Sequence, residues 1–307
     1  MTGYSVQAPA AVVVVRPHRY RPNPETGDDN AFQQPAAVDV ARAAYDASSR
    51  LIRALRDVGV RVHVFEDTTG RHPDSVFPNN WFSTHAGGRV AVFPMRAASR
   101  RGERRTDVID FLKRAYRVQE VVDYSGLEPD GIFLEGTGAM VLDHAARVAY
   151  TARSRRSDPL LLERFCTTFG YEPMVFDAVD PSGTPIYHTN VMMCVATEFA
   201  LVATEAIVDV SRRAEVVQRL EQAGRDVLAL DGHQLGEFAG NAIELRGSGA
   251  RRVLALSARA DASLTADQRA VIERSCDIVA VDVAPIELAG GSVRCMLAGV
   301  HLDPRPA

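Results

Sequence analysis

Cysteine is scarce in this sequence and lacks the spacing of metal or disulfide frameworks. The 307 residues include four cysteines, and no two of them form a Cys-x-x-Cys pair. This argues against a zinc knuckle and a disulfide scaffold, and it favours a reducing compartment. The histidines show no His-x-x-x-His spacing either, so we expect no metal site.

The sequence also lacks an excess of charge and a long hydrophobic run. Its 35 Lys and Arg residues are balanced by 39 Asp and Glu residues, and 46% of the chain is hydrophobic. This composition is typical of a globular protein and does not indicate a nucleic-acid partner. The apolar run 8–15 is short, has no basic leader and stops at Arg16, so it predicts neither a signal peptide nor a membrane span. We expect a cytoplasmic protein.

Nucleotide-binding motifs and linkers are missing as well. The stretch 136–138 does not complete Gly-x-Gly-x-x-Gly, and no Gly-x-x-x-x-Gly-Lys-[Ser/Thr] occurs. A nucleotide cofactor is therefore not expected. No Pro- or Gly-rich segment divides the chain, which predicts a single domain over residues 1–307. No fixed-period repeat is visible, which excludes obvious solenoids but leaves open a propeller whose repeats have diverged.

Short β-branched runs alternate with amphipathic helical patterns, which predicts an α/β fold. The segment 191–208 is typical of an antiparallel hairpin, and a purely parallel sheet would not contain one, so we expect mixed strand pairing. The expected strands span residues 11–15, 60–65, 90–93, 148–151, 253–256 and 278–283. The expected helices span residues 38–58, 105–116, 158–169, 211–223 and 265–275.

The stretch Gly-Gly-Ser-Val-Arg-Cys-Met at 290–296 carries the most chemical information. Cys295 follows two glycines, whose open backbone would let a substrate approach the sulfur. It also adjoins the cation of Arg294, which favours a reactive thiolate. Cys295 is therefore a candidate nucleophile. A buried cysteine that acts as a small hydrophobe is the competing interpretation.

Other residues have the chemistry to assist a nucleophile or to bind a substrate. His188 follows a turn-rich segment and exchanges protons near neutral pH, and Glu135 ends an apolar run where a carboxylate needs a partner. A surface histidine and an exposed turn glutamate are the alternatives. Asn79 and Asn80 lie in an apolar surround, where they need hydrogen-bond partners or form a turn. The basic cluster 100–105 would clamp an anion or form a solvated entry to a helix.

Four of these elements, in order, resemble the guanidine-modifying enzymes of the pentein superfamily. They are Phe-x-x-[Asp/Asn] at 77–80, Glu-Gly at 135–136, His-x-[Asp/Asn] at 188–190 and Gly-Gly…Cys-Met at 290–296. The superfamily includes arginine deiminases, dimethylarginine hydrolases and amidinotransferases, and the chain looks most like the bacterial citrulline-utilisation hydrolases. The resemblance implies five ββαβ-like modules around a pseudo-fivefold axis, an α/β propeller with the active site in its central channel.

The resemblance also implies catalytic roles. Cys295 would attack the central carbon of an amidine or ureido group and form a covalent intermediate that water then splits. His188 would protonate the departing nitrogen and activate the water, and Glu135 would hold His188 or the substrate nitrogens. No cofactor is implied.

The chain departs from the family pattern where it would hold the substrate. Deiminases and dimethylarginine hydrolases place an Asp where this chain has Asn80, and deiminases place another where it has Asn190. Two carboxylates suit a cationic guanidinium, whereas amides suit a neutral ureido group that carries its own carbonyl oxygen. Arg156 stands where relatives pair an arginine with the substrate carboxylate, and Arg96 and Arg294 are weaker candidates.

The expected reaction is therefore hydrolysis of citrulline to ornithine, carbon dioxide and ammonia. An enzyme that starts from arginine, as a deiminase or a dihydrolase, and an amidinotransferase are the alternatives. From a different class, a non-catalytic pentein binding protein would be expected to lack the nucleophile. A small molecule is the expected partner, and the sequence leaves homo-oligomerisation open.

Overall fold

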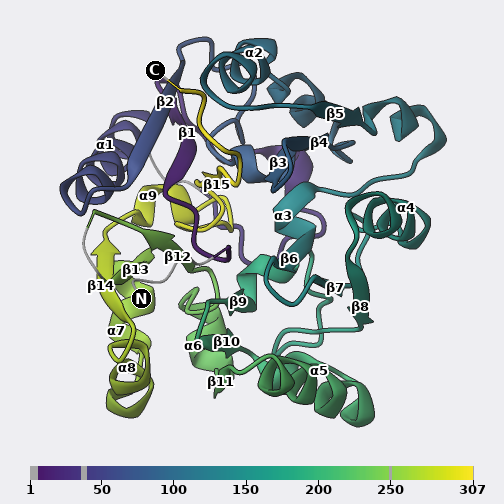
Figure 1. Ribbon diagram of the computed structural model, residues 1–307, viewed down its shortest axis with the longest axis vertical. Helices are drawn as coiled ribbons and strands as arrows, with labels where there is room; N and C mark the ends of the chain where they lie inside the picture. Colours follow the sequence, from purple (N-terminus) through teal and green to yellow (C-terminus); the bar gives the residue numbers. More distant parts are fainter. Residues whose placement is uncertain (1–5, 36–39, 249–250, 307) are drawn as a thin grey trace.

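The computed structural model describes residues 6–35, 40–248 and 251–306. Its strands form five sheets of three strands each, arranged around a central axis with the longer helices on the outside (Figure 1). In every sheet the middle strand pairs antiparallel with one neighbour and parallel with the other. The mixed pairing and the five-module α/β propeller expected from the sequence are confirmed.

Four modules follow one another along the chain, each with two strands, a helical segment and a third strand. The first holds β3 (Phe82–His85), β4 (Arg89–Val92), α2 (Thr106–Ala115) and β5 (Glu120–Asp123). The second holds β6 (Met140–Asp143), β7 (Val148–Ala152), α4 (Pro159–Phe169) and β8 (Glu172–Phe176). The third holds β9 (Met193–Val195), β10 (Phe199–Val202), α5 (Val210–Gln222) and β11 (Asp226–Ala229). The fourth holds β12 (Ile243–Arg246), β13 (Arg252–Ser257), α7 (Ala258–Ser263), α8 (Ala266–Ile272) and β14 (Cys276–Val281).

The fifth module joins the two ends of the chain. It takes β1 (Ala11–Pro17), α1 (Ala41–Asp57) and β2 (Arg61–Asp67) from the N-terminal part and β15 (Ala298–Gly299) from the C-terminal part. β1 pairs in parallel with β2 and antiparallel with β15. This pairing closes the ring, and it brings the residues just before β15 to the same end of the axis as the other modules. The described residues also form three shorter α-helices, α3 (Gly136–Ala139), α6 (Gly232–Gly236) and α9 (Ala284–Glu287), and several 3-10 helices.

Local sequence explains where the helices begin and end, as α4 illustrates. The Asp158 side chain caps it by accepting from two backbone N–H groups, and Pro159 occupies a position whose N–H needs no partner. Gly170 ends it in the left-handed conformation. The buried side chains of α4, among them Leu161 and Phe165, pack against the outer face of their own sheet in a shared core.

Every strand and helix expected from the sequence occurs, with ends that differ by a few residues. The start of the first expected helix, residues 38 and 39, lies outside the described residues. The strands that were not expected are short ones, β3, β5, β6, β8, β11, β12 and β15. Segments this short carry too few residues for hydrophobic periodicity to show.

Candidate active site

Each of the five modules brings a short segment to one end of the central axis. In every module, the segment before the strand that pairs antiparallel carries a polar side chain that is almost fully buried. Asn80 precedes β3, Glu135 precedes β6, His188 precedes β9, Asn241 precedes β12 and Cys295 precedes β15. Four of these were candidates from the sequence, and Asn241 is new.

The sulfur of Cys295 lies beside two side-chain amides. Asn190 Nδ2 and Asn241 Nδ2 each lie 3.2 Å from Cys295 Sγ. Asn241 also donates to the carbonyl of Asn190 at 2.9 Å, and its Oδ1 accepts from the Cys295 N–H at 3.4 Å. Asn241 therefore fixes both neighbours. Hydrogen-bond donors directed at a sulfur stabilise its thiolate form.

His188 is paired with Glu135. His188 Nε2 lies 2.8 Å from Glu135 Oε2, and both side chains are buried. Burial lowers the pKa of His188 to about 4, although the hydrogen bond to Glu135 opposes this shift. The ring is therefore neutral near pH 7 and carries one N–H. When Nε2 donates that hydrogen to the carboxylate, Nδ1 is left as the proton acceptor.

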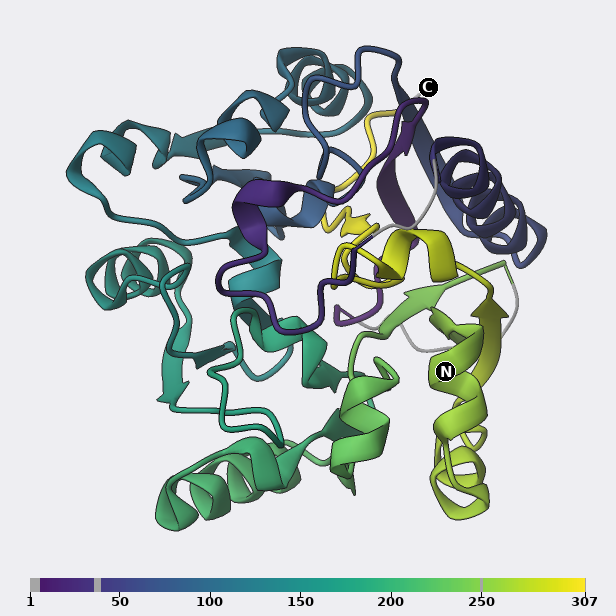
Figure 2. The same ribbon diagram turned by 180° about the vertical axis from the view of Figure 1, so that it is seen from behind.

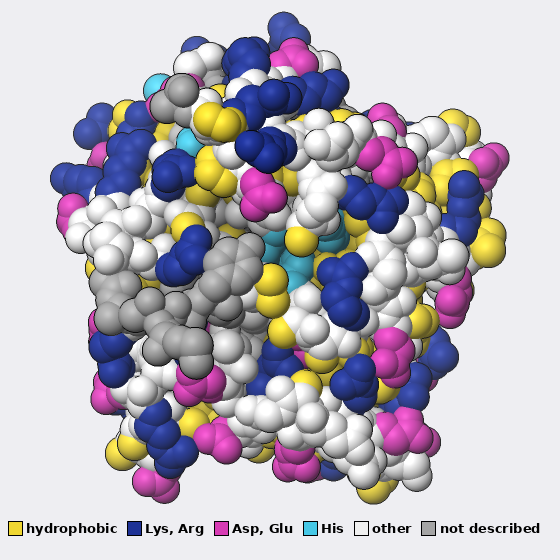
Figure 3. All heavy atoms as spheres, viewed as in Figure 1, with side chains coloured by type: hydrophobic (Ala, Val, Ile, Leu, Met, Phe, Trp, Pro, Cys, Tyr) yellow, Lys and Arg dark blue, Asp and Glu magenta, His cyan; other side chains and the backbone are white. Residues whose placement is uncertain are grey.

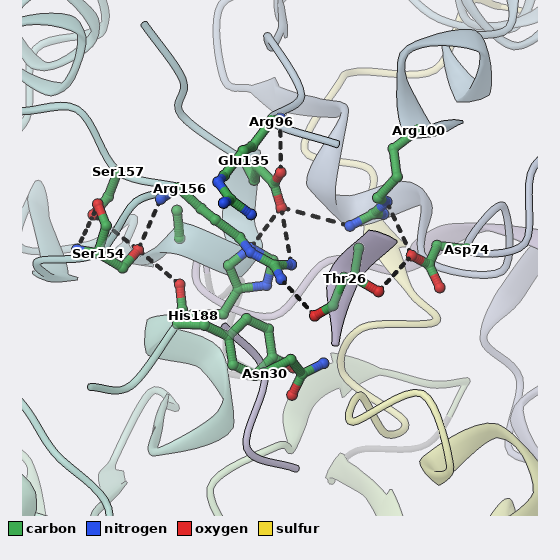
Figure 4. Close-up of polar contacts among 12 residues, drawn as sticks. Thr26, Asn30, Asp74, Arg96, Arg100, Glu135, Ser154, Arg156, Ser157 and His188 are labelled. Atoms are coloured by element: carbon green, nitrogen blue, oxygen red, sulfur yellow. Dashed lines mark hydrogen bonds and ion pairs between the residues drawn. The ribbon is translucent and has the colours of Figure 1, made fainter. Parts of the chain in front are cut away.

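Glu135 lies at the centre of a polar network (Figure 4). Its Oε1 accepts from the backbone N–H of Arg96 at 3.0 Å, and its Oε2 lies 3.5 Å from Arg100 Nη1 and 3.6 Å from Arg156 Nη1. Burial raises the pKa of this carboxyl group, but Arg156, the hydrogen bond to His188 and Arg100 together hold it well below its usual range. Glu135 is therefore an ionised group that fixes the ring of His188.

Arg100 is buried against Asn80. This position differs from the two roles considered for the basic cluster 100–105, an anion clamp and a solvated entry to a helix. With the Asn80 amide turned to suit its neighbours, its oxygen accepts from both Arg100 Nη atoms at 3.1 Å and its nitrogen donates to Asn79 Oδ1 at 3.1 Å. Arg100 also pairs with Glu103 at 2.9 Å and with Asp74 at 3.5 Å. Arg100 is 2% exposed and lines the cavity of the site, but Asp74, Glu103 and Glu135 already surround its guanidinium, so it forms neither a solvated helix entry nor an anion clamp. It orients the Asn80 amide instead.

Two of the three arginines expected to bind a substrate carboxylate already bind carboxylates of the chain. Arg156 forms a bidentate pair with Asp29 and donates to the carbonyl of Thr26 at 3.2 Å. Arg96 lies 3.2 Å from the carboxylates of both Asp28 and Asp29. A substrate carboxylate would have to replace Asp29 at these two guanidinium groups.

A small cavity, the front cavity, lies among these groups. Its volume is about 10 Å³, room for roughly one water. The segment 18–35, which contains η1 (Pro24–Thr26), crosses this end of the axis (Figure 2), and its Thr26 and Asn30 line the cavity. Because the cavity holds no more than about one water, we expect this segment to move when a substrate enters. The lining includes Thr26, Asp74, Asn80, Arg156, His188 and Cys295.

Two buried acceptors of the site lack a hydrogen-bond partner among the described residues. They are Asp74 Oδ1 and Asn190 Oδ1. Buried polar atoms are normally paired, so an unpaired acceptor beside a cavity indicates a place for a ligand N–H. Asp74 was not singled out from the sequence.

Glycines allow the segments of different modules to approach one another. Gly136 has a φ of +48°, and a Cβ added there would lie 2.5 Å from the carbonyl oxygen of Asn79. A Cβ on Gly138 would lie 2.3 Å from the side-chain amide of Asn80 and 2.8 Å from His188 Nδ1. The Glu-Gly-Thr-Gly motif is thus explained by contact between three segments of the site.

Three further sequence candidates lie away from the front cavity. Asn79 is buried behind Asn80, and Arg96 lies outside the lining. Arg294 lines a second cavity that shares no residue with the front cavity, and its Nη1 donates to the carbonyl of Leu297 at 2.9 Å. The structure therefore gives no support to Arg294 as a substrate ligand, because its side chain leaves the backbone on the side opposite to Cys295.

Asn241, Arg100 and Asp74 are residues of the site whose roles the sequence analysis missed. The signal for Asn241 is its place in the module: it stands before β12 as Asn80 stands before β3. That signal appears only when the modules are aligned on their first strands. For Arg100 the sequence offers no signal, because neighbouring arginines of the same cluster are partly exposed.

Within the described residues, no group of three or more His, Cys, Asp and Glu side chains could hold a metal ion. None of the helices in the described part of the chain has the length and apolar character needed to cross a bilayer.

A ring of five such modules, with a cysteine, a histidine and a carboxylate at one end of its axis, defines a hydrolase of the pentein class that acts on guanidino-type groups. A family model described as N,N dimethylarginine dimethylhydrolase, eukaryotic, matches residues 16–302. The chain belongs to this family, which confirms the resemblance seen in the sequence. No curated protein sequence matches the chain significantly.

Solved structures share the fold. The N-terminal domain of ArgZ, an arginine dihydrolase from the ornithine–ammonia cycle in cyanobacteria, superposes with a TM-score of 0.74 at 16% identity, over 94% of this chain and 97% of that domain. AgrE in complex with ornithine and NAD⁺ gives 0.72 at 18% identity, over 96% of this chain and 40% of AgrE. A dimethylarginine hydrolase from Pseudomonas aeruginosa in complex with citrulline gives 0.63 at 15% identity, over 95% and 99% of the two chains.

Proposed function

We propose that the protein hydrolyses citrulline to ornithine, carbon dioxide and ammonia. The observation that carries this proposal is the front cavity itself, where Cys295 and His188 meet the side-chain amide of Asn80. A cysteine with a histidine is a common arrangement for attack on a carbon bonded to nitrogen. Because Arg100 holds the amide oxygen and Asn79 accepts one N–H, the Asn80 amide has one N–H left to donate, which the carbonyl oxygen of a neutral ureido group accepts and a guanidinium does not.

In the first half of the reaction, His188 accepts the thiol proton and the sulfur of Cys295 attacks the ureido carbon. The bond from that carbon to the departing nitrogen breaks, and His188 returns the proton to this nitrogen. The lowered pKa leaves the ring neutral and able to accept a proton, and it makes the protonated ring a strong acid toward the departing nitrogen. Glu135 keeps the ring in one orientation throughout.

In the second half, water hydrolyses the covalent adduct on Cys295. His188 takes a proton from the water as it attacks the same carbon, and the carbon–sulfur bond breaks. The product of this step is a carbamate, whose remaining carbon–nitrogen bond breaks as it decomposes to carbon dioxide and the free amine. Over both halves, citrulline and one water therefore give ornithine, carbon dioxide and ammonia. The amides of Asn190 and Asn241 favour this cycle because they stabilise the thiolate that leaves in the last step.

Substrate recognition follows from the acceptors and cations around the cavity. Asn190, whose Nδ2 lies 3.2 Å from Cys295 Sγ, has an unpaired Oδ1 that suits a ureido N–H. The remaining N–H of the Asn80 amide, which lines the cavity, suits the ureido oxygen. We infer that Arg156, assisted by Arg96, takes the α-carboxylate of the substrate after Asp29 has released it. A bidentate guanidinium is well matched to that group.

A second candidate is an enzyme that starts from arginine. Asp74 favours it, because this buried carboxylate lines the front cavity with one oxygen unpaired among the described residues. A guanidinium presents only N–H donors and a positive charge, both of which a carboxylate accepts. The name of ArgZ, an arginine dihydrolase, points the same way.

The deciding experiment measures ornithine, citrulline and ammonia formed from citrulline and from arginine in parallel, with Cys295→Ala as the blank. Ornithine from citrulline alone would support the proposal. Citrulline accumulating from arginine would indicate a deiminase, and ornithine with ammonia from arginine would indicate a dihydrolase. Turnover only with an added amine acceptor would indicate an amidinotransferase.

A further inference from the structure

The second cavity lies at the other end of the central axis and is called here the rear cavity. It has a volume of about 50 Å³, and its lining includes Gln7, Thr84, His144, Cys194, Arg294 and His301. A cavity of about 10 to 15 Å³ suffices for a water, so this volume admits a small ion but not an amino acid.

A wider opening, the rear vestibule, continues the rear cavity toward the surface. The two share Pro9, His144 and His301, and the vestibule has a volume of about 220 Å³. The face drawn in Figure 3 has histidine side chains at its centre with lysine or arginine side chains around them, which fits these two openings. The rear cavity is therefore reachable from outside.

Arg294 is a cation without a carboxylate partner at the inner end of this opening. Its Nη1 donates to the carbonyl of Leu297, and no described carboxylate forms an ion pair with it. Glu244 lines the same cavity, but Arg252 holds it at 2.7 Å and Thr197 N–H donates to it at 2.9 Å. Burial lowers the pKa of Arg294 from its usual value, as expected for a cation that lacks a counter-charge.

The surrounding groups leave the positive charge on Arg294 uncompensated. The rings of His144 and His301 stack at 3.8 Å, and burial lowers the pKa of His301 to about 4, so it adds no charge near pH 7. The vestibule adds the cations of Arg61 and Arg147, and its lining contains one carboxylate, that of Asp303. A funnel of this composition attracts anions toward its inner end.

We propose that the rear cavity binds a small oxyanion, with the guanidinium of Arg294 as its main ligand. Only one of the five N–H groups of that guanidinium donates to the Leu297 carbonyl, which leaves four that do not. A planar guanidinium also matches the paired oxygens of a carboxylate, bicarbonate or phosphate. The site is independent of the reaction in the front cavity.

The test is calorimetric titration of the whole protein with phosphate, with bicarbonate and with acetate, each at constant ionic strength in chloride. At least one of the three anions should bind saturably. The anion that binds most tightly identifies whether the natural ligand is a phosphate, bicarbonate or a carboxylate. Arg294→Gln should weaken that binding by about tenfold or more, since charged hydrogen bonds are lost. The matched control Arg274→Gln removes an exposed cation that pairs with Asp226, and it should bind as the wild type does.

A second measurement uses the wild-type protein and therefore tests the proposal even if Arg294→Gln fails to fold. In the wild-type protein, the imidazole NMR signals of His144 and His301 should shift with the anion, whereas the signal of His188 in the front cavity should not. Absence of saturable binding by all three anions, wild-type affinity in Arg294→Gln, or a shift confined to His188 would each overturn the proposal.

Discussion

The front and rear cavities are lined by neighbouring residues, Cys295 and Arg294, yet they differ in whether their arginines are paired with carboxylates. In the front cavity every arginine has a carboxylate: Arg100 pairs with Glu103, and Arg156 pairs with Asp29. In the rear cavity Arg294 has only the carbonyl of Leu297 among the described residues. The same turn of backbone thus separates a compensated site from an uncompensated one.

The difference teaches what each set of charges is able to do. Paired charges hold each other in place. The network of the front cavity therefore keeps Glu135 ionised and the ring of His188 fixed, while its positive and negative charges largely cancel. An unpaired cation holds nothing in place, but it binds an anion from outside. Fixed orientation suits catalysis. The predictions below compare matched residues from the two cavities or from two positions within one.

The largest expected effect is the loss of the front thiol. Cys295→Ala should lower the rate of citrulline hydrolysis by about 10⁴-fold or more, because no nucleophile remains. The matched variant is Cys194→Ala, which removes a buried thiol from the rear cavity, where burial raises its pKa to about 12. It should keep activity and lose only stability. Equal losses of activity in the two folded variants would contradict the assignment of Cys295.

Glu135→Gln should lower kcat by about 10² to 10³-fold, because His188 loses the charged partner that orients it. Its matched variant is Glu244→Gln, a buried carboxylate in the lining of the rear cavity that pairs with Arg252. This variant should change the free energy of unfolding more than kcat. Steady-state kinetics and denaturant unfolding of both variants test the contrast, and unchanged kcat in folded Glu135→Gln would refute the role of this carboxylate.

The sequence predicted the elements with clear periodicity and the residues with distinctive chemistry. Cys295, His188 and Glu135 were candidates because of their chemistry, and the resemblance of four motifs in order to the pentein enzymes implied their roles. Burial of Arg100 could not be predicted, because it depends on carboxylates at 74, 103 and 135 that only the folded ring assembles.

The sequence could not predict the positions of Arg294 and Asn241 in the fold, and the reason differs from that for Arg100. Arg294 adjoins the nucleophile in the chain, which suggested a shared site, yet adjacent side chains diverge and this one lines the other cavity. Asn241 belongs to a module whose inner strand, β12, has only four residues and showed no pattern. Contacts between modules, not local pattern, decide both positions.

Acid should destabilise the fold through histidines of both cavities. The folded-state pKa values of His188 and His301 are lowered to about 4, below the unfolded value of about 6.5. Between these values the unfolded chain binds protons that the folded chain does not, so the free energy of unfolding falls as pH drops from 7 toward 4. Each histidine should account for about 2 kcal/mol between pH 7 and pH 5.

Denaturant unfolding at several pH values measures this slope. His301→Gln should flatten it without abolishing activity, whereas His188→Gln should flatten it and abolish activity. A free energy of unfolding that stays constant between pH 7 and pH 5 would show that these rings do not titrate as described.

Asn80→Asp should raise the ratio of kcat/KM for arginine to kcat/KM for citrulline by about tenfold, because a carboxylate prefers the cationic guanidinium. The effect should stay moderate, since Arg100 contacts this side chain with both Nη atoms and would neutralise part of the new charge. Asn79→Asp is the matched control, because Asn79 lies behind Asn80 and outside the cavity lining. If the ratio of kcat/KM for arginine to kcat/KM for citrulline were the same in the wild type and both variants, the neutral side chain at position 80 would no longer be a reason to expect citrulline as the substrate.

The smallest expected effect concerns the carboxylate that occupies Arg156 in the free protein. Asp29→Asn should lower KM for the preferred substrate by a few fold with little change in kcat, because the substrate carboxylate then displaces a neutral group. Asp28→Asn is the matched control: this carboxylate is 56% exposed and pairs with Arg96 and Arg155, outside the cavity lining, so its KM should change less. A higher KM in Asp29→Asn would mean that Asp29 closes the segment 18–35 over bound substrate, since loss of a competitor can only tighten binding whereas loss of a closing contact weakens it.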